Sequence, residues 1–276
     1  MRHGIYPGAP KYPFTPGYDI AGYIEKTGES VKEFKPGERV VALTQFGGYA
    51  QYVCVDKNIP IKIPDKMDLD AAVSLVLNYI TAFQMIHSTA RLKKGNTVLI
   101  HSAAGGVGTA LLQLGKVMGL KIYGTASVMK HTIVEKYGFA IDYKNEDFVQ
   151  RIKELEPEGL DAVFDPIGGD NWERSLKTLK KDGQLIGFGG LSMFNRDRLI
   201  SNHLTVISTK ENFIFYRVPV NNHEQLKENY TKLLKLYEEK LIDPIVGKIL
   251  ALEEVRTAHK LLSEGRIIGK IILNCS

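Results

Sequence analysis

Cysteine is scarce in this sequence. Of 276 residues, only Cys54 and Cys275 are cysteines, and they stand far apart in the chain. Two distant cysteines provide neither a disulfide framework nor a cysteine-based metal cluster. We therefore expect a protein of a reducing compartment, for which the cytoplasm is the default localisation.

A secretion signal and a long hydrophobic run are also lacking. The first ten residues, MRHGIYPGAP, contain no apolar core of a signal peptide. The longest uncharged stretch, residues 71–86, is interrupted by polar side chains such as Ser74 and Gln84. It is shorter than the roughly 18 apolar residues of a membrane span. The sequence therefore predicts no membrane span.

Charge of one sign is not concentrated in the sequence. Its 36 basic and 31 acidic side chains give a formal net charge of +5, and they are interleaved along segments such as Phe148–Leu155. A basic stripe with aromatic side chains between its charges, which is typical of nucleic-acid binding, does not occur. We expect no nucleic-acid partner. A content of 44% hydrophobic and 24% charged residues is ordinary for a soluble globular protein.

The most informative segment that is present covers residues 96–118, NTVLIHSAAGGVGTALLQLGKVM. A short apolar strand over Thr97–Ile100 precedes a glycine-rich turn, and apolar residues then recur at helical spacing. In this setting a Gly-x-Gly-x-x-Gly pattern indicates dinucleotide binding, and here Ala103 stands at the first glycine. Gly105 lets the main chain approach a pyrophosphate, and Gly108 lets the helix pack closely on the strand. An ordinary strand–helix turn is the alternative.

The end of the second strand indicates which dinucleotide is bound. Sites for NAD usually place an acidic side chain about 20 residues further on, where it holds the ribose hydroxyls. The strand predicted over residues 121–125 ends without Asp or Glu, and Lys130 and His131 follow it. Such a neutral-to-basic end favours a 2′-phosphate, so we expect NADPH. The alternative is that Lys130 is only a solvated residue of the next helix.

Helices and strands continue to alternate after this motif. We predict helices over residues 130–137, 147–155, 172–179 and 224–240, and strands over residues 140–143, 160–164, 184–188 and 204–208. This alternation predicts a parallel, doubly wound α/β sheet. Ligands of such sheets bind beyond the carboxyl ends of the strands, which places residues 165–169 and 188–190 at the cofactor rim. Each of these two segments is equally consistent with a plain turn.

The first 75 residues differ in composition and in predicted secondary structure. Prolines punctuate short strands predicted over residues 21–25, 39–42 and 49–55, as in an irregular antiparallel sheet or barrel. Similar signals return near the C-terminus, with strands predicted over residues 246–250 and 270–273 around a helix at 252–263. We predict a nucleotide-binding domain, residues 76–245, inserted in a discontinuous β domain, residues 1–75 and 246–276. The active site is expected in the cleft between the two domains.

A series of short motifs supports a more specific identification. In chain order they are PGYDIAG at 16–22, KPGERV at 35–40, GYAQY at 48–52, Thr81-Ala82, the glycine turn at 103–108, DPIGG at 165–169 and GKI at 269–271. The series resembles the medium-chain dehydrogenase/reductase superfamily, in its zinc-free quinone oxidoreductase (zeta-crystallin-like) branch, over essentially the whole chain. The resemblance implies a Rossmann domain inserted in a GroES-like barrel.

The same resemblance implies that no metal is bound. Zinc-dependent relatives have a Gly-His-Glu triplet, which carries a metal ligand, where this chain has Gly17-Tyr18-Asp19. The four-cysteine lobe of those relatives is also lacking, and no His, Cys and Glu cluster stands at ligand spacing. Asp19 is therefore interpreted as a structural or supporting residue.

Members of the family usually begin with a longer N-terminal segment, which supplies the first barrel strands and an asparagine-bearing active-site loop. Residues 1–7 resemble the loop that follows this segment. We therefore expect an incomplete barrel, in either a fragment or a naturally shortened member. We expect the lack of this N-terminal segment to affect catalytic activity more than cofactor binding.

The resemblance implies hydride transfer from NADPH to an electron-poor carbon of a quinone or an α,β-unsaturated carbonyl. Without a metal, hydrogen-bond donors must stabilise the developing charge on oxygen. The candidates are Tyr6, in a segment similar to the family's active-site tyrosine loop, Asn78, and Thr81, which matches the family's Thr-Ala step beside the nicotinamide. Packing or helix capping is the alternative role for each of them.

The cofactor-binding residues that the resemblance implies lie on several turns. Ala103, Gly105, Gly106 and Val107 are expected at the pyrophosphate; Ser127, Lys130 and Tyr143 at the 2′-phosphate; and Phe188 and Gly189 at the rim. Phe46 and Phe188 are also candidates for the wall of an apolar pocket, with core packing as the alternative.

Two further expectations concern activity and assembly. A short-chain dehydrogenase is excluded because none of the 13 tyrosines has a lysine four residues later. A catalytically weak or inactive NADPH-binding scaffold protein is the alternative function. The resemblance implies a homodimer formed through the strand at residues 204–208. Residues 212–216, NFIFY, are interpreted as part of a partner surface or of the substrate pocket.

Overall fold

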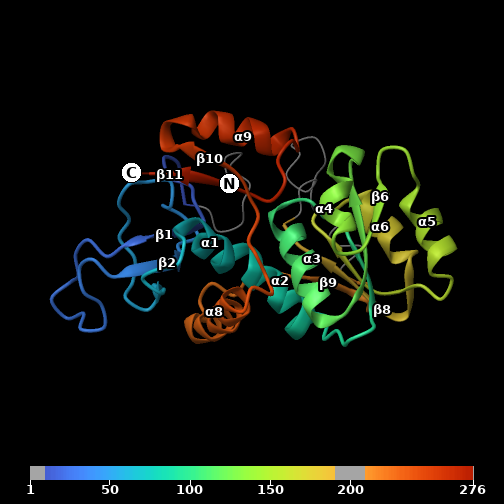
Figure 1. The fold of residues 1–276 in the computed structure, drawn as a ribbon, viewed down its shortest axis with the longest axis horizontal. Coiled ribbons are helices and arrows are strands. Elements are labelled where there is room, and N and C mark those ends of the chain that lie inside the picture. Colours follow the sequence, from blue (N-terminus) through green and yellow to red (C-terminus); the bar gives the residue numbers. More distant parts are fainter. Residues whose placement is uncertain (1–9, 190–208, 276) are drawn as a thin grey trace. The chain divides into compact units, whose positions relative to one another are not determined.

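The computed structural model describes residues 10–189 and 209–275. The chain divides into two compact units: unit 1 comprises Met1–Ile80 and Pro219–Ser276, and unit 2 comprises Thr81–Val218. In Figure 1 the blue segments, the orange helix α8 and the red elements α9, β10 and β11 belong to unit 1, and the green and yellow segments belong to unit 2. One unit is therefore continuous in sequence, and the other is assembled from both ends of the chain.

The centre of unit 2 is a parallel sheet. Its strands are β4 (Thr97–Ile100), β5 (Lys121–Ala126), β6 (Phe139–Asp142), β7 (Leu160–Asp165), β8 (Leu179–Gly187) and β9 (Phe213–Phe215). They lie in the order β6-β5-β4-β7-β8-β9, and every neighbouring pair is parallel. The chain steps outward from β4 to β6 and returns on the other side of β4, so the topological switch point lies between β4 and β7. This topology confirms the predicted doubly wound α/β sheet.

Helices connect these strands, as the predicted crossover connections require. They are α3 (Gly106–Met118), the 3₁₀ turn η3 (Val128–Lys130) with α4 (His131–Glu135), α5 (Phe148–Leu155) and α6 (Asp170–Leu176). Helix α5 begins after Asp147 because the carboxylate of this residue accepts from the N–H groups of Val149 at 2.8 Å and Gln150 at 3.3 Å.

The core of unit 2 includes a strand that was not predicted. Phe213 on β9, within residues 212–216, is buried. Its ring packs against Trp172 on α6 with 5.0 Å between the ring centres, and Phe215 packs against the same cluster. Phe213 therefore belongs to the core, whereas the rest of β9 is only partly buried. That residues 212–216 contribute to a partner surface or to the substrate pocket stays a prediction.

The described residues of unit 1 form two small sheets. Strands β1 (Asp19–Tyr23), β2 (Arg39–Leu43) and β3 (Ile61–Lys62) form an antiparallel sheet, and β10 (Val246–Ala251) pairs in parallel with β11 (Lys270–Asn274). Between β10 and β11 the chain forms the 3₁₀ turn η5 (Leu252–Glu254) and α9 (Val255–Ser263), which runs alongside the two strands in Figure 1. Together with the sheet of unit 2, this is the predicted Rossmann-plus-GroES-like class.

The strand predicted over residues 49–55 does not form. The segment starts instead as a bend, in which the N–H of Tyr49 donates to the oxygen of Pro16 at 2.9 Å and the N–H of Gly48 donates to the oxygen of Gly17 at 3.2 Å. Tyr52 is 74% exposed. The start of the segment is thus held against the Pro16–Gly17 backbone instead of pairing as a strand.

Helix α8 (His223–Glu238) belongs to unit 1, whereas the boundary predicted at residue 245 assigned it to the nucleotide-binding domain. The reason is local packing. Tyr230 on α8 is buried, and its hydroxyl donates to the oxygen of Ala72 at 3.5 Å.

The helical segment Leu69–Thr89 leads from unit 1 into unit 2. It consists of α1 (Leu69–Ser74), η1 (Leu75–Tyr79), α2 (Ile80–Gln84) and η2 (Met85–Thr89), of which η1 and η2 are π-helical. Its length and its mean hydropathy of 1.4 are sufficient for a membrane span, but 72% of the apolar window is buried inside the protein. Buried core helices of globular units have the same composition, so one such helix is weak evidence for a span.

Candidate cofactor site

The loop between β4 and α3 turns the main chain tightly. The N–H of Gly105 donates to the oxygen of Ser102 at 2.9 Å, and the N–H of Thr109 donates to the oxygen of Gly105 at 2.8 Å. Ser102 has a φ of 53°, in the left-handed region. Helix α3 then begins at Gly106. The N–H groups in the first turn of a helix have no intrahelical acceptor, so this turn offers a site for an anion.

Gly108 is required by the packing of this turn. A methyl group at position 108 would lie 2.3 Å from the oxygen of Ser102 and 2.6 Å from the oxygen of Ala103. Backbone atoms cannot yield to such a contact without moving the loop. The glycine therefore keeps the start of α3 against the strand–helix turn, which is the role that the sequence pattern predicts for it.

Ala103 shapes the turn from inside. Its side chain is fully buried, and its N–H donates to the oxygen of Thr125 on β5 at 3.1 Å. A methyl group at Gly124 would lie 2.8 Å from the Cβ atom of Ala103. Ala103 thus packs against β5, whereas Gly105, Gly106 and Val107 are partly exposed; the cofactor contact expected of Ala103 stays a prediction.

The turn after β5 carries two of the residues predicted at a 2′-phosphate. Ser127 precedes η3, and its main-chain oxygen accepts from the N–H of Lys130 at 2.8 Å. The side chain of Lys130 is half-buried, and this burial lowers the pKa of its ammonium group. The two residues between Ser127 and Lys130 are exposed, Val128 to 60% and Met129 to 89%. Lys130 is thus held closer to the protein than a solvated helix residue would be.

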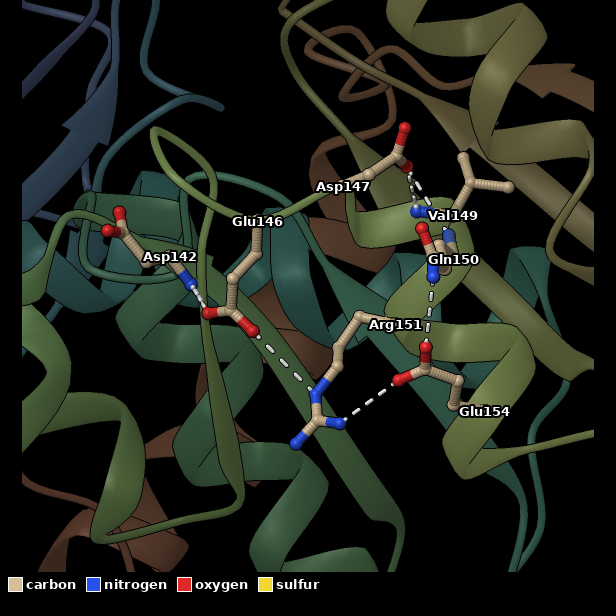
Figure 2. A network of polar contacts seen from close by, with 7 residues as sticks. All are labelled: Asp142, Glu146, Asp147, Val149, Gln150, Arg151 and Glu154. Atoms are coloured by element: carbon tan, nitrogen blue, oxygen red, sulfur yellow. Dashed lines mark hydrogen bonds and ion pairs between the residues drawn. The ribbon is translucent and has the colours of Figure 1, made fainter.

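Tyr143 follows the neighbouring strand β6 and is 56% exposed. The turn that presents it is fixed by its flanking acidic residues. The carboxylate of Asp142 accepts from the N–H of Lys144 at 3.2 Å, and Glu146 accepts from the N–H of Asp142 at 2.8 Å. Figure 2 shows Glu146 between this N–H and Arg151, whose Nε lies 3.6 Å from the Glu146 carboxylate. Because β5 and β6 are adjacent and parallel, Lys130 and Tyr143 both follow carboxyl ends at one edge of the sheet.

The turn after β7 is organised by Asp165, which is fully buried. One of its carboxylate oxygens accepts from the N–H groups of Ile167 at 2.7 Å and Gly168 at 3.2 Å. The other accepts from Asn171 Nδ2 at 2.7 Å and from Ser175 Oγ at 3.1 Å. With four donors on one carboxylate, Asp165 is occupied in holding the loop at the switch-point edge of the sheet.

Phe188 and Gly189 follow β8. The N–H of Phe188 donates to the oxygen of Asp165 at 3.1 Å, and its side chain is only 6% exposed. Gly189 has a φ of +64°, which L-residues rarely adopt. Phe46, the other candidate for a pocket wall, belongs to unit 1 and packs edge-on against Phe14 with 5.6 Å between the ring centres. Residue 190 lies outside the described residues.

The predicted catalytic residues are distributed over the two units. Asn78 lies on η1 in unit 1, Thr81 lies on α2 in unit 2, and both side chains are largely buried. Tyr6 lies outside the described residues, as does the strand predicted over residues 204–208. The π-helical turn that contains Asn78 was not predicted, although such turns occur frequently at functional sites.

Sequence reasoning missed two buried polar connections in unit 2. Tyr216 donates from its hydroxyl to Gln84 Oε1 at 2.5 Å. His101, directly after β4, contacts Thr125 at 3.0 Å through Nδ1 and Ser175 at 3.1 Å through Nε2. The only sequence feature that could have indicated these contacts is the position of His101 immediately before the glycine turn.

Among residues 10–189 and 209–275, no group of three or more His, Cys, Asp or Glu side chains is placed to hold a metal. Asp19, at the position that corresponds to the metal-binding triplet of zinc-dependent relatives, lies 2.5 Å from Lys270 Nζ. This ion pair links β1 to β11, and the interpretation of Asp19 as a structural or supporting residue stays a prediction.

Family models match two parts of the chain. Residues 1–65 match the model described as alcohol dehydrogenase GroES-like domain, and residues 137–273 match the model described as zinc-binding dehydrogenase.

Individual relatives cover nearly the entire chain. It is 32% identical to the human "Synaptic vesicle membrane protein VAT-1 homolog-like", over 99% of this chain and 70% of that protein. It is 30% identical to the human quinone oxidoreductase, over 99% of this chain and 83% of that protein. The crystal structure of Escherichia coli quinone oxidoreductase complexed with NADPH superposes with a TM-score of 0.88 at 28% identity, over 98% of this chain and 85% of that one. With a Rossmann sheet, a GroES-like segment and these relatives, the chain belongs to the medium-chain dehydrogenase/reductase superfamily of oxidoreductases, in its quinone oxidoreductase branch.

Proposed function

We propose that the protein is an NADPH-dependent reductase that transfers a hydride to a quinone or to an α,β-unsaturated carbonyl compound. Family membership supports an oxidoreductase, and one structural neighbour is a quinone oxidoreductase in complex with NADPH. The observation that carries the choice of cofactor is the end of β5. This strand ends without the Asp or Glu that an NAD site usually has, and a half-buried lysine, Lys130, follows it.

The binding roles follow from the turns at the carboxyl edge of the sheet. In this proposal the N–H groups of Gly106 and Val107 bind the pyrophosphate, and Gly105 leaves room for its approach. Ser127, Lys130 and Tyr143 hold the 2′-phosphate, because they follow two adjacent strands. Phe188 and Gly189 complete the rim beyond β8.

Bound NADPH supplies the hydride. The protein must orient the acceptor, exclude water and stabilise the oxygen on which negative charge develops. We assign these roles to Thr81 and Asn78 as hydrogen-bond donors and to Tyr6 as a donor of a phenolic proton. The resemblance of these positions to the family's active-site segments supports the assignment.

We further propose that the reaction needs no zinc. Asp19 is committed to Lys270, so the metal-binding triplet of zinc-dependent relatives has no counterpart here. The test is elemental analysis of the purified protein together with activity in the presence of a chelator. We expect substoichiometric zinc and unchanged turnover; stoichiometric zinc whose removal abolishes turnover would contradict the proposal.

The main experiment measures NADPH oxidation with a panel of quinones, enals and enones against a control without acceptor. Acceptor-dependent oxidation with a preference for NADPH over NADH is the expected result. Saturable NADPH binding without oxidation of any acceptor would favour the alternative function, a cofactor-binding protein without catalysis.

Assembly is tested separately. We propose a homodimer, on the grounds of the family resemblance. Sedimentation or light scattering of the purified protein at several concentrations measures the mass of the species in solution, and a monomer throughout would contradict the proposal.

A further inference from the structure

A buried histidine lies at the centre of the candidate cofactor site and has no role in the function proposed above. His101 immediately follows β4 and is 3% exposed. Its main-chain N–H donates to the oxygen of Phe164 on β7 at 2.9 Å. Its ring nitrogens contact Thr125 Oγ1 and Ser175 Oγ, at 3.0 Å and 3.1 Å. One imidazole therefore connects β4, β5 and α6.

The hydrogen bonds determine which ring nitrogen carries the proton. The hydroxyl of Ser175 donates to Asp165 Oδ2 at 3.1 Å, so Ser175 Oγ accepts on its other side. Nε2 of His101 must then be the donor to Ser175. Nδ1 is left as an acceptor, and the hydroxyl of Thr125 donates to it. All four side chains are satisfied by a single state, the neutral Nε2–H tautomer.

This chain of hydrogen bonds joins three of the turns at the candidate site. Thr125 stands two residues before Ser127, and its main-chain oxygen accepts from Ala103 in the glycine turn. At the other end, Asp165 holds the N–H groups of the loop that follows β7. The turns after β4, β5 and β7 are thus tied to one another through the side chain of His101.

We propose that His101 is a positioning residue for the dinucleotide: in its neutral Nε2–H form it keeps the turns after β4, β5 and β7 in the arrangement that binds the phosphates, and its protonation weakens NADPH binding. The inference rests on the proposed function, because it assumes that these turns hold NADPH. It adds a dependence on the protonation state of a residue that does not touch the cofactor.

The surroundings of the imidazole favour the neutral form. Burial is the largest influence, and it lowers the pKa of His101; the guanidinium of Arg174 lowers it further, while the carboxylate of Asp165 acts in the opposite direction. The ring also packs edge-on against Phe148, with 4.6 Å between the ring centres. The guanidinium carbon of Arg174 lies 4.5 Å from the centre of the Phe148 ring, and Arg174 also forms an ion pair with Asp147 at 3.0 Å. Figure 2 shows Asp147 at the start of α5.

Protonation disturbs the network at a specific atom. An imidazolium carries a second N–H at Nδ1, which faces the hydroxyl of Thr125. That hydroxyl must reverse to accept, and its own hydrogen then needs a new acceptor inside β5. A buried donor without a partner is unfavourable, so Thr125 and the turn beyond it are expected to shift.

The decisive measurement is the dissociation constant of NADPH as a function of pH. Because burial lowers the pKa of His101, the imidazolium forms only toward the acid end of the range. Between about pH 7.5 and about pH 4.5 we expect the dissociation constant of the wild-type protein to rise at least about threefold more than that of His101→Gln, which keeps an amide donor but cannot be protonated. Titration of the 2′-phosphate contributes equally to both proteins and cancels in the comparison. His223→Gln in unit 1 is the matched control, and it should follow the wild-type profile.

A second measurement needs no variant. Nitrogen-15 NMR of the imidazole in the wild-type protein should show a proton on Nε2 and none on Nδ1 near neutral pH. A proton on Nδ1, or a His101→Gln profile identical to that of the wild type, would overturn the role of His101 and leave the proposed function intact. Absence of NADPH binding by the wild-type protein at about pH 7.5 would overturn both proposals.

Discussion

Lys130 is the residue on which the choice between the two nicotinamide cofactors depends. We predict that Lys130→Glu raises the dissociation constant of NADPH by at least about 30-fold, because it replaces a cation near the 2′-phosphate with an anion. The constant for NADH should change less than about threefold. Fluorescence titration with both cofactors measures the two effects. Lys136→Glu, an exposed reversal on the same side of β5, controls for net charge, and equal losses for both cofactors would refute the assignment.

Gly108 is the residue at which the cofactor turn tolerates no side chain. Gly108→Ala places a methyl group 2.3 Å from the oxygen of Ser102. We expect a loss of about 2–4 kcal/mol in the free energy of unfolding, together with a large loss of NADPH affinity. Urea unfolding and cofactor titration measure the two quantities. Gly22→Ala, where a methyl group meets nothing within 4 Å, should be nearly neutral; similar behaviour of the two variants would contradict the packing argument.

At this scale the sequence predicted positions better than contacts. Ser127, Lys130 and Tyr143 follow the carboxyl ends of β5 and β6, and strand prediction alone places them there. The sequence did not predict that Ala103 is buried or which side chains His101 contacts. Thr125 and Ser175 lie 24 and 74 residues from His101 in the chain, and only the folded sheet brings them together.

Among the elements, the loop between β7 and α6 has a single organising side chain. We predict that Asp165→Asn costs about 2–4 kcal/mol in the free energy of unfolding, because the new amide nitrogen would face the donors Asn171 and Ser175, or the N–H groups on the other side. Urea unfolding measures the change. Asp182→Asn, at an exposed position on β8, is the matched control and should shift stability by less than about 0.5 kcal/mol. Equal stability of the two variants would show that Asp165 does not hold the loop.

The boundaries of helices and strands were predicted least well around α6 and β8, which follow β7 in the chain. Helix α6 covers Asp170–Leu176 where residues 172–179 were expected, and β8 begins at Leu179 where residue 184 was expected. The charged segment between Leu179 and Gln184 resembles a turn in sequence. In the structure it forms a register shift in the pairing of β8 with β7, and periodicity does not reveal such a shift.

Across the whole molecule, unit 1 depends on contacts between the two ends of the chain. Asp19 on β1 and Lys270 on β11 form an ion pair in which each side chain is 12% exposed. Lys270→Met alone should cost about 3 kcal/mol in the free energy of unfolding, because it leaves a buried carboxylate without a partner. Adding Asp19→Leu should restore much of the loss. Urea unfolding of the two single variants and the double variant measures the coupling, and additive effects would show that the pair does not interact.

At the scale of the whole molecule, sequence patterns predicted the two kinds of unit but not the unit to which each helix belongs. Alternating strands and helices indicated the inserted Rossmann sheet and the β segments on either side of it. The assignment of α8 depends on Tyr230 reaching the main chain of Ala72, and amphipathic periodicity gives no information about which neighbour a helix will meet.

The discontinuity of unit 1 has a consequence for biosynthesis. Asp19 and Lys270 are separated by 251 positions, so β1 leaves the ribosome long before its partner residue has been translated. Unit 2 is continuous in sequence and is complete once Val218 has emerged. Domains that are continuous in sequence fold as units during translation. Nascent chains should therefore acquire the Rossmann sheet first, while β1 awaits the later translation of β11.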